Sequence, residues 1–508
     1  MVKPLETEVL IIGGGINGTA IARELSKYKI DVTLVEKEVD VSFGISKGSN
    51  GQVYTGLEMA LSLALKKVAG TVSEEMEKAK ERICDQGYRL WEQMFHELEI
   101  PYRVVGLMVI ATNAEEFQKL NAMHKQYAKN YGLKILGKEE ILSIEPNVTQ
   151  EAIAGLYEPG HMMVHNPFDA VIALAENAKD NGIRILLNCE VSAITKGKGF
   201  QTVETSNGRI KTRFIVNASG RYVDKIAAMA GPCGFGFQCF RGHLLITDKN
   251  VGGIVNNVIT TPPLPGIAKV VQPTVDGNLR LGTLYEETKD RFDHRTILSG
   301  MNEVMERARS LVPSLSPRDI ITYFTGTRMF SNRDAAEYII ESPKENPKFI
   351  SVGPGMPGFT PAPAIAKIVV ERLENEGLQL VERRDFNPYR KNITRFSSLS
   401  NPQKADLIRR EASYGHVLCR CEHVTEAEVV ESIRRGATTL DGIKFRTRAG
   451  MGRCQGGFCG PQVVEILVRE LNIPVTHVTK RGGKSRLLLY QTKELLKTHR
   501  RNRDDAAC

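Results

Sequence analysis

Residues 8–36 read EVLIIGGGINGTAIARELSKYKIDVTLVE, and this stretch decides the fold. The apolar run at 8–12 is short enough for a buried parallel strand, and residues 20–25 continue with helical spacing. A second β-branched run at 32–35 predicts the next strand. Strand, helix and strand in this order predict a βαβ unit, and therefore a parallel sheet with helices on its faces.

Three glycines occupy the turn between the first strand and the helix. Gly13, Gly15 and Gly18 match G-x-G-x-x-G, and Glu36 lies 18 residues past the last glycine. The glycines allow the backbone to approach a pyrophosphate at the helix N-terminus, and the acidic side chain can bind ribose hydroxyls. The stretch therefore predicts a dinucleotide site, whose contacts we expect at Gly13, Gly15, Ile16, Asn17, Gly18, Glu36 and Lys37.

Four cysteines near the C-terminus form a second motif. One residue separates the first two, four separate the last two, and 32 lie between the pairs Cys419/Cys421 and Cys454/Cys459. Zinc sites usually use C-x2-C, whereas four thiolates at other spacings suit a [2Fe–2S] cluster. Glycines around the second pair can turn backbone N–H groups toward sulfur. The favoured interpretation is a [2Fe–2S] cluster; structural zinc and free thiols are the alternatives.

The residues around these cysteines carry a resemblance. The stretches Cys419–Glu422 and Arg448–Cys459 resemble the bacterioferritin-associated-ferredoxin type of [2Fe–2S] domain. That domain is appended to the large subunit of anaerobic glycerol-3-phosphate dehydrogenases and their relatives. The resemblance implies that electrons leave one at a time through the cluster to a partner subunit or acceptor.

Three further segments resemble the flavin-contacting segments of the D-amino acid oxidase-like flavoproteins. They are Gly44–Gly51, Arg213–Gly220 and Gly353 with Met356–Ala364. The resemblance implies FAD, and we expect Thr360 to cap a helix that begins at Pro361. The FAD contacts that it implies beyond the glycine turn are Ser46, Lys47, Gly48, Ser49, Val191, Ala218, Ser219, Gly220, Gly353, Gly358, Phe359 and Thr360.

The expected fold is an α/β Rossmann-type FAD-binding domain with an antiparallel β-rich substrate domain and a small, mainly α, C-terminal [2Fe–2S] domain. The chain passes between these domains several times. We predict FAD-binding parts at 1–90, 161–234 and 331–377, substrate parts at 91–160 and 235–330, a linker at 378–415, the cluster domain at 416–479 and a basic tail at 480–508.

The substrate site is less sharply marked. Gly326–Arg328 resembles the family's G-x-R motif, whose arginine binds a substrate carboxylate or phosphate through its planar guanidinium. Relatives that oxidise alcohols, such as L-2-hydroxyglutarate and glycerol-3-phosphate dehydrogenases, tend to carry a histidine just after the second flavin segment, and here that stretch contains Tyr54 and no histidine. Since an alcohol must lose a proton as hydride leaves, His243 and His165 are the other candidate bases.

Composition agrees with a cytoplasmic protein. The 508 residues have ordinary apolar content, and no run of 18 apolar residues or signal peptide is seen. Residues 480–508 carry nine Lys/Arg against three Asp/Glu. Without a nucleic-acid motif, this tail is interpreted as a solvated end, with docking to an acidic partner or the inner face of a membrane as the alternative.

These observations support an FAD-dependent dehydrogenase that oxidises CH–OH in a small anion, of the glycerol-3-phosphate or 2-hydroxy acid type. Oxidation of a C–N bond in an amino or imino acid is the alternative, because a neutral amine needs no protein base. A third hypothesis is an electron-transfer flavoprotein subunit of a larger complex.

Overall fold

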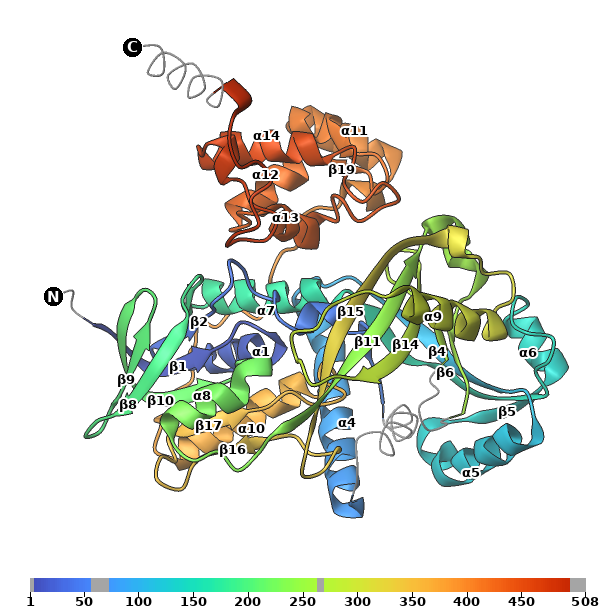
Figure 1. Cartoon of the computed structure of the whole chain (residues 1–508), viewed down its shortest axis with the longest axis horizontal. Helices are drawn as coiled ribbons and strands as arrows, with labels where there is room; N and C mark the ends of the chain where they lie inside the picture. The colour runs from blue at the N-terminus through green and yellow to red at the C-terminus, as the bar shows by residue number, and fades with distance from the viewer. Residues whose placement is uncertain (1–3, 56–72, 263–268, 494–508) are drawn as a thin grey trace, which may run out of the picture. The chain divides into compact units, whose positions relative to one another are not determined.

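The computed structural model describes residues 4–55, 73–262 and 269–493. It divides into two compact units (Figure 1). The first comprises residues 1–37 and 41–392, and the second comprises 38–40 and 393–508. Among the described residues, no helix is long and apolar enough to cross a membrane.

A largely parallel sheet forms one half of the first unit. Its main path runs β16-β17-β10-β1-β2-β7, and the hairpin strands β8 and β9 extend it beside β10. The predicted βαβ unit is confirmed, since β1 pairs in parallel with both β2 and β10. The strands are β1 (Leu5–Ile12), β2 (Val32–Val35), β7 (Arg184–Leu186), β8 (Val191–Lys196), β9 (Gln201–Thr205), β10 (Gly208–Asn217), β16 (Ile340–Glu341) and β17 (Phe349–Val352).

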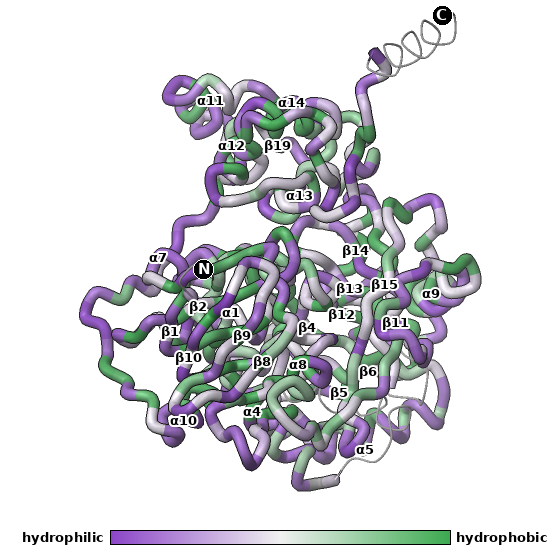
Figure 2. The backbone as a smooth tube through the Cα atoms, turned by 60° about the vertical axis from the view of Figure 1, so that its left-hand side comes forward, coloured by the Kyte–Doolittle hydropathy of each residue, from purple (hydrophilic) through white to green (hydrophobic). Residues whose placement is uncertain are grey.

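Helices cover this sheet because its strands are apolar on both faces. The strands β1, β2 and β17 are buried almost throughout, and the helices α1, α7 and α10 pack together on the sheet. Figure 2 shows hydrophobic stretches running through the sheets, with hydrophilic residues along the outer loops. These helices are α1 (Ile16–Leu25), α4 (Glu74–Glu97), α7 (Pro167–Asp180), α8 (Val223–Ala230) and α10 (Ala362–Asn375).

A nine-stranded sheet forms the other half of the unit. The predicted antiparallel region at 235–330 is present, and earlier strands join it in the order β15-β11-β14-β13-β12-β4-β6-β3, with β5 paired to β6. Helices α5, α6 and α9 pack against it through two hydrophobic clusters. Its elements are β3 (Gln52–Val53), β4 (Tyr102–Ala111), α5 (Ala114–Tyr131), β5 (Lys134–Gly137), α6 (Lys138–Ile144), β6 (Ala154–His165), β11 (Phe237–Thr247), β12 (Val258–Thr260), β13 (Val270–Pro273), β14 (Leu279–Glu287), α9 (Leu298–Leu311) and β15 (Ile320–Ser331).

The second unit is small and mainly helical. The T-x-x-E pattern of Thr425 and Glu428 predicts a capping box, and the structure has it at the start of α12. The predicted linker contains a helix, α11, that its composition did not predict. The capping box at Ser400 and Gln403 is a sequence signal from which this helix could have been predicted. The elements are α11 (Asn401–Arg410), β18 (Val417–Cys419), β19 (Val424–Thr425), α12 (Glu426–Arg434), α13 (Leu440–Thr447) and α14 (Gly460–Leu471).

Two local expectations need correction. The sequence of 184–190 predicts a strand that reaches Glu190, but β7 ends at Leu186 because Asn188 has a positive φ of 51° and turns the chain. The cysteines scattered outside the cluster motif are predicted from the sequence to be buried as small apolar residues. Cys84, Cys189 and Cys239 are buried, whereas Cys233 is only half-buried. Cys508 lies outside the described residues.

Candidate functional site

The predicted nucleotide segments meet at one edge of the parallel sheet. The register aligns Ile12 of β1 with Val35 of β2 and with Asn217 of β10, and Asn217 aligns with Ser351 of β17. Each segment therefore begins where a parallel strand ends, which is the edge where open α/β sheets bind ligands. The segments are the glycine turn after β1, Glu36 after β2, Ala218–Gly220 after β10 and Gly353 after β17.

The glycine turn has the close approaches that its sequence predicts. Gly13 has a φ of 109°, and a Cβ there would lie 2.5 Å from the carbonyl oxygen of Ala218. A Cβ on Gly18 would lie 1.9 Å from the carbonyl oxygen of Gly13. Among the described residues, the buried atoms Asn17 Oδ1 and Ser42 Oγ have no hydrogen-bond partner. The residues fit a bound dinucleotide, because a bare backbone and unused polar atoms meet at a helix N-terminus.

Glu36 is linked at this edge of the sheet to the segment that leads to Val191. The Glu36 carboxylate accepts a hydrogen bond of 2.6 Å from the backbone N–H of Gly14, and the Glu36 carbonyl accepts one of 2.8 Å from Cys189. Val191 begins β8 two residues later. Lys37 points elsewhere, since its Nζ donates to the Tyr222 hydroxyl at 2.9 Å. This end of the site is suited to the adenosine half of a dinucleotide.

The second and last predicted flavin segments are tied to the same site. Ser46 lies in a short 3-10 turn, and its Oγ accepts a hydrogen bond of 3.0 Å from the N–H of Ile16. Lys47 and Ser49 flank Gly48 there. Asn17 Nδ2 donates to the Gly353 carbonyl at 3.5 Å, which joins the last loop to the glycine turn.

The capping role expected for Thr360 is wrong. Helix α10 begins at Ala362, its N-cap position is Pro361, and no side chain caps it. Thr360 is fully buried, and its Oγ1 instead accepts a hydrogen bond of 3.4 Å from the N–H of Tyr54. The neighbouring carbonyl of Phe359 accepts one of 3.0 Å from Trp91. The loop that contains Gly358 is thus held by α4 and by the segment after β3.

Arg328 lies on β15 and reaches the predicted flavin segment. It is 7% exposed, and its Nη2 donates to the Gly48 carbonyl at 2.7 Å while Nη1 contacts the Thr327 carbonyl at 3.3 Å. The neighbouring Gly326 is so close to Gly48 that a Cβ would lie 3.1 Å from its oxygen. Arg328 therefore supports the backbone of the flavin segment in addition to any contact with substrate.

A second buried arginine lies on this sheet and was not among the residues predicted from the sequence. Arg280 of β14 is 4% exposed, and its Nε donates to Gln272 Oε1 at 2.9 Å. Gln272 Nε2 in turn donates to the Asn50 carbonyl at 3.2 Å. Asn50 Nδ2 donates to Gln52 Oε1, and Gln52 Nε2 is buried without a hydrogen-bond partner among the described residues. An arginine between the core residues Leu279 and Leu281 was the signal that could have found it.

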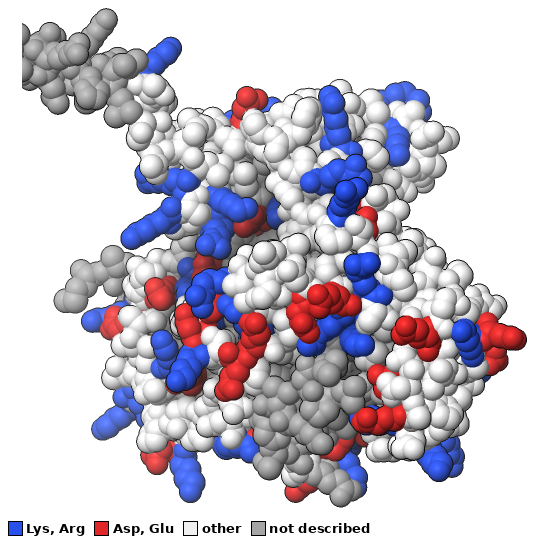
Figure 3. All heavy atoms as spheres, turned by 45° about the vertical axis from the view of Figure 1, so that its right-hand side comes forward, with Lys and Arg blue, Asp and Glu red and all other residues white. Residues whose placement is uncertain are grey.

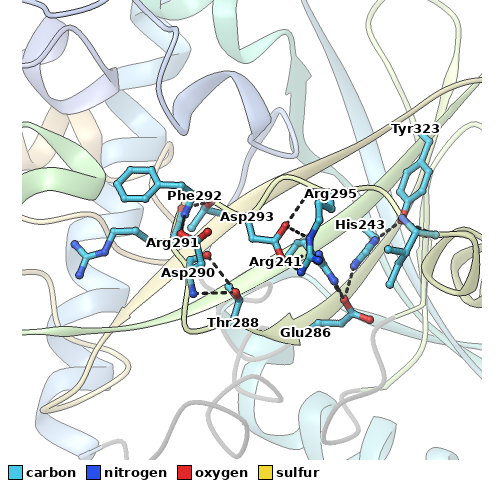
Figure 4. A network of polar contacts seen from close by, with 12 residues as sticks. Arg241, His243, Glu286, Thr288, Asp290, Arg291, Phe292, Asp293, Arg295 and Tyr323 are labelled. Atoms are coloured by element: carbon cyan, nitrogen blue, oxygen red, sulfur yellow. Dashed lines mark hydrogen bonds and ion pairs between the residues drawn. The ribbon is translucent and has the colours of Figure 1, made fainter.

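His243 belongs to a buried network on the opposite face of the sheet (Figure 4). Its Nδ1 contacts the Tyr323 hydroxyl, its Nε2 contacts Glu286 Oε2 at 2.9 Å, and the side chain is 0% exposed. Burial alone raises the pKa of Glu286, but hydrogen bonds from Arg241 and His243 outweigh it and hold that pKa below its usual value. A histidine with both ring nitrogens engaged is placed to stabilise the strands, which argues against the expected role as a base that contacts substrate.

The other two candidate bases are enclosed by apolar groups. His165 packs against Trp91, Phe95 and Phe359, and burial lowers its pKa to about 4. Neither ring nitrogen has a described side-chain or backbone partner within hydrogen-bond geometry. Tyr54 is 5% exposed and belongs to the hydrophobic cluster beneath β4 and β6. His165 is consequently a neutral imidazole at physiological pH.

The four cysteines converge in the second unit as two pairs. Cys421 and Cys454 are exposed, and their sulfurs lie 3.8 Å apart. Cys419 and Cys459 are buried and hydrogen-bonded to each other. Pro461 after Cys459 predicts a helix start, and in the structure Cys459 is the N-cap residue of α14 with Pro461 in its first turn. Two close pairs of sulfur atoms suit two adjacent metal ions, each needing two thiolates.

Backbone N–H groups point at these sulfurs. A hydrogen bond from the Cys459 thiol lowers the pKa of Cys419 to about 6, and the N–H groups of Gly450, Glu422 and Cys421 act in the same direction. The N–H groups of Phe458 and Gly456 likewise lower the pKa of Cys454. Among the described residues, no three ligating side chains converge as a single ion would require. The paired sulfurs and the N–H groups directed at them fit an anionic two-iron cluster.

Two family models match the two units. Residues 8–372 match the model described as FAD dependent oxidoreductase. The chain belongs to this family. Residues 417–469 match the model described as BFD-like [2Fe-2S] binding domain. The protein is therefore an FAD-dependent oxidoreductase whose cofactors are FAD and a [2Fe–2S] cluster.

Similar proteins cover most of the chain. The glycerol 3-phosphate dehydrogenase of Caloramator mitchellensis is 37% identical over 96% of this chain and 99% of its own. The anaerobic glycerol-3-phosphate dehydrogenase subunit A1 of Haloferax volcanii is 25% identical over 91% of this chain and 83% of its own. The solved L-α-glycerophosphate oxidase of Mycoplasma pneumoniae, in a dithionite-reduced form with FAD bound, is 28% identical, with a TM-score of 0.67, over 76% of this chain and 98% of its own.

Proposed function

We propose that the chain is a glycerol 3-phosphate dehydrogenase, which oxidises the secondary alcohol of that substrate to a ketone and sends the electrons through its [2Fe–2S] cluster to a partner protein. The observation that carries the proposal is the coverage of its relatives. The dehydrogenase from Caloramator extends over 96% of the chain, cluster domain included. The structure of the relative named as an oxidase covers 76% of the chain, and almost the whole of that shorter relative is used. About a quarter of this chain thus lies outside the match to a relative that suffices for an oxidase.

Side chains on the nine-stranded sheet favour the binding of an anionic substrate. Arg328 and Arg280 are buried on the sheet face that meets residues 48–52, and Gln52 has an unused donor there. Guanidinium groups bind phosphate through paired N–H donors, and a dry site strengthens that attraction. We assign Arg328 and Arg280 to hold the phosphate end of the substrate, so that its carbinol end faces the flavin.

The chain's residues would hold and orient the reactants. FAD, when bound, accepts the hydride from the carbinol carbon. We assign its nucleotide half to the glycine turn and Glu36, and the flavin contacts to the segments at 46–49 and 358–360. The stretch in which alcohol-oxidising relatives tend to carry a histidine contains Tyr54 and no histidine, so we propose that the hydroxyl proton leaves without such a base.

Oxidation of a C–N bond is less favoured. The relatives that span the length of the chain are named for glycerol 3-phosphate. A subunit that only relays electrons is also disfavoured, because such a protein has no need of buried arginines beside the flavin segment. The acceptor is proposed to be a partner subunit or carrier protein. Contact of the basic tail with the inner face of a membrane stays a prediction, and residues 494–508 of that tail lie outside the described residues.

Anaerobic flavin bleaching tests the substrate. Purified holoenzyme is mixed with glycerol 3-phosphate, L-2-hydroxyglutarate, glycine or proline, and the flavin absorbance is followed in the stopped-flow instrument. We expect rapid bleaching only with glycerol 3-phosphate. Bleaching by an amino acid at a comparable rate would show that the enzyme oxidises a C–N bond and that the proposal is wrong.

A further inference from the structure

The exposed edge of the cluster site has a distinctive surface. Cys421 and Cys454 reach solvent, whereas Cys419 and Cys459 are buried. A cluster bound by these residues would therefore be nearest to solvent on the side of Cys421 and Cys454. Electron transfer becomes slower with distance, so an outside acceptor has reason to dock on this side. We define the exit surface as Arg420, Cys421, Arg453, Cys454 and Phe458.

Charge on the exit surface has one sign. Arg420 and Arg453 are exposed on the two loops 419–423 and 450–460, both of which are fully described. The single acid in these loops is Glu422, which is buried and accepts a hydrogen bond of 2.7 Å from Arg448. The segment 416–479 as a whole is nearly balanced, with eight Lys/Arg against seven Asp/Glu. Residues 393–508 as a whole are basic, with 21 Lys/Arg against 12 Asp/Glu, so the arginines of these two loops add to a basic unit.

An exposed aromatic ring lies within this charged edge. Phe458 is 49% exposed, and the guanidinium of Arg420 lies over its ring at 4.4 Å from the centroid. This contact holds Arg420 beside the cysteines without burying its charge. Figure 3 shows that basic side chains predominate over acidic ones on the face of the C-terminal unit that it draws. A large exposed apolar group rimmed by arginine is the composition of a protein-binding site.

We propose that the exit surface binds an acidic electron-carrier protein, which takes electrons from the cluster at the Cys421/Cys454 side. Arg420 and Arg453 steer the carrier electrostatically, and Phe458 supplies the apolar centre of a small, transient interface. The step is a one-electron transfer in which the reduced cluster is oxidised and the carrier is reduced, with no bond made or broken. This proposal depends on the proposed function only for the source of the electrons, since the cluster can also be reduced chemically.

The test measures binding and reoxidation separately. Holoenzyme reduced with dithionite, and the oxidised holoenzyme, are titrated with a plant-type ferredoxin of net negative charge as the probe. The variants are Arg420→Glu, Arg453→Glu, the double variant and Phe458→Ala. Arg434→Glu, an exposed arginine at the end of α12, is the matched control. Iron content and the reduction potential confirm that each variant keeps its cluster.

We expect the double variant to bind the probe at least about tenfold more weakly at low ionic strength, with a smaller loss at high salt. Reoxidation by the probe slows in parallel, whereas reoxidation by a small neutral dye is unchanged. Unaltered affinity in the double variant would overturn the proposal, as would an equal loss in Arg434→Glu. The proposal is also wrong if these variants slow reduction of the cluster by substrate and leave probe binding intact, because the surface would then serve the chain's own flavin. Failure to bleach the flavin with glycerol 3-phosphate affects none of these readouts.

Discussion

Three charged or titratable side chains, Arg328, Arg280 and Glu158, are buried in the first unit. Arg328 is stabilised by carbonyl oxygens, and Arg280 by the amide of Gln272. Glu158 of β6 is 2% exposed, and burial raises its pKa to about 7 against a hydrogen bond from Thr55. Such groups are expensive to bury, so each is expected to matter for binding, for catalysis or for the pH dependence of stability.

The two arginines give the first prediction. Arg280→Ala should lower kcat/KM for glycerol 3-phosphate by a factor on the order of 10², because about 3 kcal/mol is lost when one partner of a buried charge pair is removed. Arg328→Ala should lower kcat/KM by at least the same factor. It should also weaken FAD binding, since the hydrogen bond to the Gly48 carbonyl is lost. Steady-state kinetics and FAD titration separate the two effects. Arg309→Ala, on the exposed side of α9, is the control and should leave both unchanged.

Unchanged kinetics in Arg280→Ala would remove that residue from the substrate site. If FAD affinity alone falls in Arg328→Ala, its role is confined to the flavin segment. Arg280→Lys and Arg328→Lys should recover only part of the loss, because lysine keeps the charge and lacks the planar pair of donors.

Glu158 gives the second prediction. Its folded pKa lies above the ordinary value of 4.5, so the folded state binds this proton more tightly than the unfolded state. The contribution to stability is full below about pH 4.5 and is lost as the pH rises through 7. Glu158→Gln stays neutral, so its stability should exceed that of the wild type by up to about 3 kcal/mol at pH 8 and by little at pH 5. Denaturant unfolding at the two pH values measures the difference. Equal effects at both would show that Glu158 does not titrate in this range.

At the scale of single elements, the loop before α14 contains residues that the cluster site needs. Gly452 leaves no room for a side chain, because a Cβ would lie 2.3 Å from the Cβ of Cys421. Cys459 occupies the N-cap position of α14, at the positive end of the helix dipole. The whole ligand set lies in the second unit, whose hydrophobic core contains Cys419 and Cys459.

The third prediction follows from this separation. Cys454→Ser should lose about two irons per chain and the associated visible absorption, because a [2Fe–2S] centre needs four thiolates. The FAD content and the rate of flavin bleaching by substrate should be unchanged. Cys233→Ser, a half-buried cysteine of the first unit, is the control and should keep both cofactors. Loss of FAD together with iron would show that the two units do not fold independently.

At the scale of the whole molecule, the enzyme combines a flavin unit with an electron-transfer unit in one chain. The solved oxidase relative matches only the first of these parts. The second unit is useful if electrons leave through it, and its exposed cysteine pair offers the exit.

The fourth prediction concerns oxygen. The enzyme should turn over much faster with an artificial acceptor or an acidic carrier protein than with oxygen, and removal of the cluster by Cys454→Ser should abolish reduction of the carrier. Oxygen uptake and peroxide assays alongside dye reduction measure this. Vigorous peroxide production that is unchanged by loss of the cluster would count against the electron route through the second unit.

From the residues alone, the sequence predicts the fold class, a dinucleotide site and a four-cysteine cluster motif, and the resemblance of further segments adds FAD. The glycine turn and the four cysteines have spacings set by local backbone geometry, so their chemistry can be recognised without knowing the rest of the chain. The boundaries of β2 and the capping box at Thr425 follow from the same local rules. The strand boundary and the capping box need only neighbours within a few residues, whereas the two motifs are recognised by fixed spacings along the chain.

Only the tertiary structure decided the surroundings of the substrate. His243 lies on the far face of the sheet and contacts Glu286 of another strand. Arg328 donates to the Gly48 carbonyl, and Arg280 is linked through Gln272 to Asn50. Each of these contacts joins residues from different strands or segments. The direction in which each of these side chains points depends on strand register, and a shift of one residue would turn it to the opposite face. The hydrogen bond from Gln272 to Asn50 joins residues more than 200 positions apart in the sequence, and no local pattern records such a contact.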